Sequence, residues 1–82
     1  MRVIFLGYLK DTAGKAEIEI IPETRPESVD DLIASVAGDN TCLSGALSHP
    51  SIHVIINKSI PAGDELPDRI DEVAFMPPLS GG

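Results

Sequence analysis

The last three residues, Ser80, Gly81 and Gly82, are the part of the sequence whose chemistry is most distinctive. Glycine has no Cβ atom, so a Gly-Gly backbone can enter a channel that is too narrow for other residues. A terminal carboxylate can be activated by ATP to an acyl-adenylate, which a nucleophile then attacks. The alternative is that the two glycines form an inert, loose chain end, as is common in domains.

The rest of the sequence offers no self-sufficient active site. It contains neither a G-x-x-x-x-G-K phosphate loop nor a G-x-G-x-x-G motif, so we do not expect the chain to bind ATP by itself. His49 and His53 are separated by Pro50 and do not form a metal-binding pair. The single cysteine, Cys42, lies beside Leu43, which favours a buried or inert thiol. We therefore expect no cofactor and no metal bound by this chain.

Length and composition indicate one small domain of 82 residues, of which 43% are hydrophobic. The net charge of −7 disfavours nucleic acid as a partner. The negative charge would attract basic patches on partner proteins, or it serves solubility alone. The apolar run at residues 1–6 is too short for a signal peptide, and no segment approaches a membrane span. Together with the single cysteine, this predicts a cytoplasmic protein.

Hydrophobic periodicity predicts the elements that must position the tail. The expected strands are 2–6, 16–20, 52–56 and 72–76, with a very short fifth strand beginning at Ile60. The expected helix is 29–37, with Ser28 as its N-cap and Gly38 as its stop. Residues 7–14 are interpreted as a connection, and residues 40–50 as a short second helical turn.

The order of these elements predicts an α+β protein with a β-grasp fold. We expect a mixed sheet of four to five strands, with one main helix on one face and the first and last strands side by side in the centre. Residues 1–76 would form the domain and residues 77–82 the tail. Alternation along the two central strands then sorts the side chains. The helix side takes Val3, Phe5, Val73 and Phe75, which leaves Ile4, Leu6, Ala74 and Met76 as an open apolar patch. Such a patch binds a partner or is covered by a loop.

Residues 71–82, DEVAFMPPLSGG, strongly resemble the C-terminal signature of the small subunit of molybdopterin synthase. Members of that family are ubiquitin-like sulfur carriers of the MoaD/ThiS superfamily. Residues 3–14 are similar to the family's opening strand and loop, and residues 54–60 are similar to its segment around Asn57. Chain length and element order also match.

The resemblance implies a mechanism in which the chain is a sulfur-carrying, non-catalytic subunit of a synthase. A separate ubiquitin-activating-like adenylyltransferase would use ATP and magnesium to adenylate the Gly82 carboxylate. A sulfur donor protein would convert the acyl-adenylate to a thiocarboxylate. The tail would then enter the large synthase subunit and supply sulfur to the pyranopterin precursor in molybdenum cofactor biosynthesis. The family assembly is a heterotetramer of two small and two large subunits.

The resemblance also assigns roles to residues. Gly82 carries the sulfur, and the residues implied in threading the tail are Gly81, Ser80, Leu79, Pro78 and Pro77. The family's partner-binding patch falls on Leu6, Ile60 and Met76. The sequence departs from the family where Ile70 replaces a glycine, so the turn before the last strand should differ locally.

Three alternatives remain open at the level of sequence. The chain could carry sulfur for thiamine thiazole synthesis or tRNA thiolation, although the Phe-x-Pro-Pro tail favours the molybdenum branch. It could be a ubiquitin-like modifier joined to lysines through an isopeptide bond. It could also be an interaction domain with an inert tail.

Overall fold

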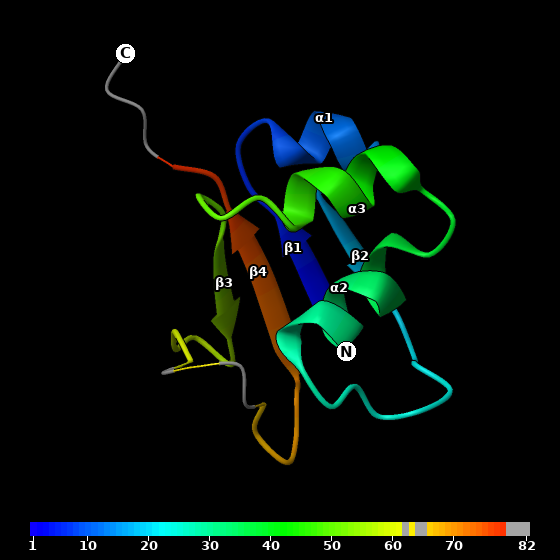
Figure 1. The fold of residues 1–82 in the computed structure, drawn as a ribbon, viewed down its shortest axis with the longest axis vertical. Coiled ribbons are helices and arrows are strands. Elements are labelled where there is room, and N and C mark those ends of the chain that lie inside the picture. Colours follow the sequence, from blue (N-terminus) through cyan, green and yellow to red (C-terminus); the bar gives the residue numbers. More distant parts are fainter. Residues whose placement is uncertain (62, 64–65, 79–82) are drawn as a thin grey trace.

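The computed structural model describes residues 1–61, 63 and 66–78, which form a sheet with helices against one of its faces (Figure 1). The strands are β1 (Arg2–Phe5), β2 (Glu17–Glu19), β3 (His53–Ile56) and β4 (Glu72–Met76). The helices are α1 (Leu9–Ala13), α2 (Val29–Ala37) and α3 (Thr41–Leu47). Within the described residues, no helix is long and apolar enough to cross a membrane.

The sheet has four strands in the order β2-β1-β4-β3. The first and last strands, β1 and β4, are parallel neighbours at its centre, with Val3 paired to Val73 and Phe5 to Phe75. The outer strands β2 and β3 are antiparallel to β1 and β4. This is the expected β-grasp arrangement, and it explains why the two central strands are nearly continuous apolar runs.

The hydrophobic core lies between this sheet and the helices. Val3, Val73 and Phe75 are fully buried and Phe5 is 2% exposed, as the alternation of the two strands predicts. The rings of Phe5 and Phe75 stack with their centroids 6.1 Å apart. The helices contribute Leu9, Leu32, Ile33, Val36, Ala37, Leu43 and Leu47. The core is therefore mostly aliphatic around one aromatic pair.

The main helix α2 begins and ends at the residues that the sequence predicts. The Ser28 hydroxyl accepts a hydrogen bond from the Asp31 amide at 3.1 Å, and the Asp31 carboxylate accepts one from the Glu27 amide at 3.3 Å. These contacts satisfy amide groups that have no partner within the helix. Gly38 ends the helix at a φ of 56°, where a side chain would be strained.

Residues 7–14 are more than the connection that the sequence predicts, because they contain helix α1. Its Leu9 is fully buried, and Gly14 ends it at a φ of 82°. A helix of five residues shows too little periodicity to be recognised, and its stability comes from packing rather than propensity. The expected second helical turn is confirmed and is longer, since α3 spans seven residues.

Two other expectations differ from the structure. No strand begins at Ile60, whose side chain is 66% exposed, although Ser59 bridges back to Ile56. Cys42 is exposed on α3, so the expectation of a buried thiol is wrong, while that of an inert thiol stays a prediction.

Candidate functional site

The face of the sheet opposite the helices carries a group of apolar side chains. Ala74 is paired with Ile4 on one side and Ile55 on the other. Leu6 continues this face beyond β1, because its amide donates to the Phe75 carbonyl at 3.0 Å, beside Met76. We call Ile4, Leu6, Ile55, Ala74 and Met76 the apolar end of the open face. Leu6 is 38% exposed, while Ile4, Ile55 and Met76 are half-buried.

Ala74 belongs to this face even though it is only 9% exposed. It is not part of the hydrophobic core cluster. Its small side chain lies between two isoleucines in register, which shield it from solvent. Ile4, Ala74 and Ile55 therefore form a continuous apolar row across β1, β4 and β3, and the β3 residue opposite Met76 is the exposed His53.

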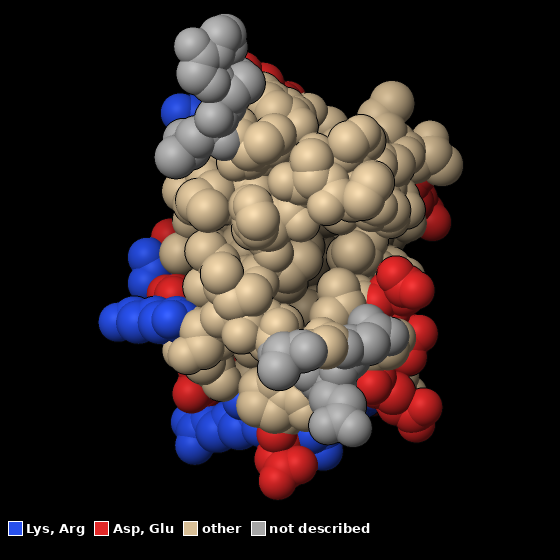
Figure 2. Space-filling view, turned by 60° about the vertical axis from the view of Figure 1, so that its left-hand side comes forward, with Lys and Arg blue, Asp and Glu red and all other residues tan. Residues whose placement is uncertain are grey.

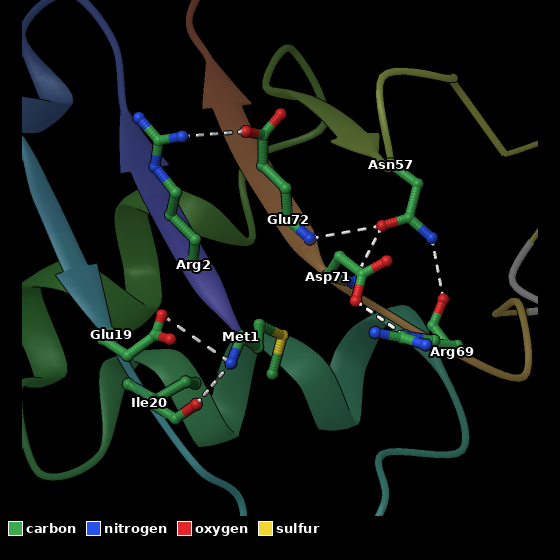
Figure 3. A network of polar contacts seen from close by, with 8 residues as sticks. All are labelled: Met1, Arg2, Glu19, Ile20, Asn57, Arg69, Asp71 and Glu72. Carbon is green, nitrogen blue, oxygen red and sulfur yellow. Dashed lines mark hydrogen bonds and ion pairs between the residues drawn. The ribbon is translucent and has the colours of Figure 1, made fainter.

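The other end of the open face is polar. The Arg2 guanidinium donates to the Glu17 carboxylate at 2.8 Å and lies 3.5 Å from the Glu72 carboxylate (Figure 3). The hydrogen bond to Glu17 raises the pKa of Arg2 above its ordinary value. The Met1 amino group donates to the Ile20 carbonyl at 2.9 Å and lies 3.7 Å from the Glu19 carboxylate. Charged groups thus gather where β4 starts, and apolar groups where it ends.

The start of β4 is held by the side chain of Asn57. Its carbonyl oxygen accepts from the amides of Asp71 at 2.8 Å and Glu72 at 3.2 Å. Its amide nitrogen donates to the Arg69 carbonyl at 2.7 Å (Figure 3). Asn57 sits in a tight turn at a φ of 50°, which asparagine tolerates better than most residues. We call these contacts the Asn57 clamp.

The turn before β4 does not require a glycine. Among the described residues other than glycine, only Asn57 and Lys58 have a positive φ, so Ile70 is not strained. Its partly buried side chain packs against the core. Isoleucine therefore adds apolar contact at a position where the resembled family has a flexible residue.

The end of β4 is held by apolar packing. Gly7 has a φ of 58°, and a Cβ atom placed on it would lie 2.7 Å from Cγ of Pro77. Pro77 is buried against this glycine, whereas Pro78 is exposed. The tail residues singled out from the sequence, Leu79, Ser80, Gly81 and Gly82, lie outside the described residues. Their roles in threading and sulfur transfer therefore stay predictions.

The residues predicted to form the partner-binding patch are only partly gathered. Leu6 and Met76 are neighbours at the apolar end, next to the point where the tail leaves. Ile60 follows the turn beyond β3, at the outer edge of the sheet. Ile55 was missed by sequence reasoning because its place opposite Ala74 depends on the pairing of β3 with β4. The only sign of this in the sequence is that Ile55 alternates with Ile56, which is buried, so that Ile55 lies on the opposite face.

The surface on the β3 side of the molecule is uncharged in its middle (Figure 2). Seen from the side of Figure 1 that carries β3, neutral residues fill the centre of the surface, and acidic and basic residues lie around it (Figure 2). Within residues 1–61, 63 and 66–78, no three His, Cys, Asp or Glu side chains are grouped so that they could hold a metal ion.

Solved structures with the same fold include two archaeal examples of small archaeal modifier protein 1. One from Haloferax volcanii has a TM-score of 0.77 at 22% identity, covering 100% of this chain and 98% of that chain. One from Methanosarcina acetivorans has a TM-score of 0.72 at 26% identity, covering 99% and 94%. No curated protein is significantly similar in sequence.

The sequence model of the ThiS family matches residues 3–82, which include most of β1, all of β4 and the terminal Gly-Gly. The shared fold covers the whole chain, and the family match covers all but its first two residues. The chain therefore belongs to the ThiS family, within the MoaD/ThiS superfamily of small ubiquitin-like sulfur carriers.

Proposed function

We propose that this chain is the sulfur-carrying small subunit of molybdopterin synthase. The observation that carries the proposal is the course of β4, which ends in Met76 at the apolar end of the open face and continues directly into Pro77 and Pro78. One strand thus links a surface suited to a partner with the Gly-Gly tail that would enter that partner. The Phe75-x-Pro77-Pro78 segment favours the molybdopterin pathway over other pathways that use a sulfur carrier.

The reacting group in this proposal is the Gly82 carboxylate. One of its oxygens attacks the α-phosphate of ATP on a ubiquitin-activating-like adenylyltransferase, with magnesium neutralising the phosphates, and pyrophosphate leaves. The outer sulfur of a persulfide on a donor protein then attacks the acyl carbon, and AMP leaves. A thiol cleaves the S–S bond to the donor, forming a disulfide with it, and frees the thiocarboxylate. The resulting thiocarboxylate gives its sulfur to the pyranopterin precursor in the large subunit, and hydrolysis restores the carboxylate.

The rest of the chain serves as a docking module. Leu6 and Met76 supply exposed apolar area beside the tail, and Ile60 would add to it from the outer edge. Burial of such a patch drives association. The net charge of −7 favours partner surfaces that are basic and speeds their encounter with this chain.

The decisive test is reconstitution with defined components. The thiocarboxylated chain is incubated with the large synthase subunit of the same source and the pyranopterin precursor, and molybdopterin is measured after oxidation to its fluorescent derivative. We expect one thiocarboxylate to be consumed for each sulfur transferred. A variant that lacks Gly82 is the control and should give no product. Consumption of the thiocarboxylate without molybdopterin formation would contradict the proposal.

A second function, conjugation to other proteins, is favoured by the likeness to small archaeal modifier protein 1 from Methanosarcina acetivorans. In that case an acceptor lysine, instead of a sulfur nucleophile, would attack the activated Gly82 carbonyl. Protease digestion of cell extracts followed by mass spectrometry would reveal Gly-Gly remnants on lysines, and their loss on deletion of this chain would assign them to it.

A sulfur carrier for thiamine thiazole synthesis or tRNA thiolation would use the same activated tail but a different acceptor. Isolation of the protein that binds the thiocarboxylated chain most tightly separates these pathways from the molybdenum branch. Recovery of a thiazole synthase or a tRNA-thiolating enzyme, and no large synthase subunit, would favour such a pathway.

A further inference from the structure

We propose that Gly7 is a positioning residue for the tail reaction, because it makes room for the Pro77 ring and thereby sets the direction in which the chain leaves β4. The kinetic part of this inference rests on the proposed function, in which the tail is the reacting group. Its structural part does not depend on that function.

The contact joins two segments that are far apart in sequence. The Leu6 amide donates to the Phe75 carbonyl at 3.0 Å, which extends the pairing of β1 with β4 by one step. Gly7 follows at a φ of 58°, and a Cβ atom there would lie 2.7 Å from Cγ and 3.4 Å from Cδ of Pro77. Cβ atoms essentially never come within 3.0 Å of such a neighbour. The space occupied by the Pro77 ring therefore exists only because residue 7 is glycine.

Gly7 is itself fixed on both sides. Before it, Leu6 is held by the hydrogen bond to β4, and after it the Gly7 carbonyl accepts from the Lys10 amide at 3.3 Å, at the beginning of α1. Leu9 of this helix is fully buried in the core. The backbone on which Pro77 rests is therefore part of the rigid domain.

Packing has to set the direction of the tail because the prolines cannot do so through hydrogen bonds. Pro77 and Pro78 have no amide hydrogen, so neither can donate to the sheet beyond Met76. Their φ angles are fixed near −65°, so a fixed Pro77 passes its orientation on to the next residues. Holding a reacting segment in a narrow range of directions lowers the entropy lost when it enters a partner.

The chain contains a matched control for this contact. Gly38 has a φ of 56°, almost the same as that of Gly7, but a Cβ atom on it would meet nothing within 4 Å. Gly7→Ala and Gly38→Ala thus each place a side chain at a positive φ, where it is strained. Only Gly7→Ala also displaces the Pro77 ring.

The structural test compares amide spectra of the 15N-labelled full chain. We expect Gly7→Ala to shift the amide signals of Leu79, Ser80, Gly81 and Gly82, whereas Gly38→Ala leaves them at their wild-type positions. The Pro77→Ala variant removes the ring, so adding Gly7→Ala to it should cause no further shift. Tail signals that are the same in wild type and folded Gly7→Ala would overturn the inference. If Gly7→Ala does not fold, Pro77→Ala alone must shift the amide signals of Gly81 and Gly82, and unchanged signals there would overturn the inference.

The kinetic test measures ATP–pyrophosphate exchange by the activating enzyme as a function of carrier concentration. For Gly7→Ala we expect the KM for the carrier to rise about five- to tenfold above that of Gly38→Ala, with kcat changing less than about twofold. Equal KM values for the two variants would overturn the positioning role. If wild type is not adenylated at all, the proposed function fails, and the amide spectra still decide whether Gly7 orients the tail.

Discussion

The two faces of β4 serve different purposes although they alternate along a single strand. Val73 and Phe75 point toward the helices and are fully buried, whereas Ala74 and Met76 belong to the open face. The first pair stabilises the domain, whereas Met76 of the second pair offers apolar area on the open face. Stability and partner binding should therefore be separable by substitutions at adjacent residues.

The two ends of β4 differ in a similar way. The Asn57 clamp holds its start through hydrogen bonds to Arg69, Asp71 and Glu72, while its end rests on the contact between Gly7 and Pro77. Hydrogen bonds hold the start of the strand, and apolar packing holds Pro77, the residue that follows its end.

The largest expected effect comes from the helix-covered face. Phe75→Ala should lower the free energy of unfolding by about 3–5 kcal/mol, because it leaves a cavity beside Phe5. Urea unfolding followed by circular dichroism measures this loss. Met76→Ala, on the other face of the same strand, should cost less than about 1 kcal/mol. Similar losses for the two variants would contradict the division between the faces.

The next effect concerns the start of β4. Asn57→Gly keeps a residue that tolerates the positive φ but removes the side-chain hydrogen bonds of the clamp. We expect a loss of about 1–3 kcal/mol in the free energy of unfolding. Lys58→Gly is the matched control, since Lys58 has a φ of 68° in the same turn. It should be neutral or stabilising, and an equal loss would show that the turn, not the clamp, matters.

On the open face we expect a small change in the free energy of unfolding and a measurable loss of affinity for a partner. Met76→Asp should weaken binding to the activating enzyme by about tenfold or more, since it places a charge in a buried contact. Its thermal unfolding should stay close to wild type. Titration calorimetry compares the loss of affinity in Met76→Asp with that in Ile60→Asp. A larger loss for Met76→Asp would place the centre of the binding patch beside the tail. A stronger loss for Ile60→Asp would move the centre to the sheet edge.

The smallest effect is expected at the polar end. Arg2 and Glu17 are exposed, and Glu72 is half-buried at a longer distance of 3.5 Å, so these ion pairs add little to stability. Arg2→Gln should lower the melting temperature slightly at low ionic strength and not at about 1 M salt, where charges are screened. A large drop in the melting temperature that persists at high salt would mean that this polar end contributes substantially to the stability of the domain.

The sequence allowed the faces of β1 and β4 to be assigned, because strict alternation leaves one consistent choice once Phe5 and Phe75 are buried. The caps of α2 could also be predicted, since they depend on nearby residues. Helix α1 escaped prediction because a helix of five residues carries little periodicity. The roles of Gly7 and Asn57 could not be found because each depends on a contact with a distant segment.

The central claim, that the Gly82 carboxylate is the working group and the domain its carrier, is tested most directly by intact mass spectrometry. The chain is incubated with the activating enzyme, ATP, magnesium and a sulfur donor, alongside a variant without Gly82. We predict that the mass of the wild-type chain rises by the difference between one sulfur and one oxygen atom, and that the mass of the variant stays unchanged. An unchanged wild-type mass, or an equal rise in the variant, would contradict the account.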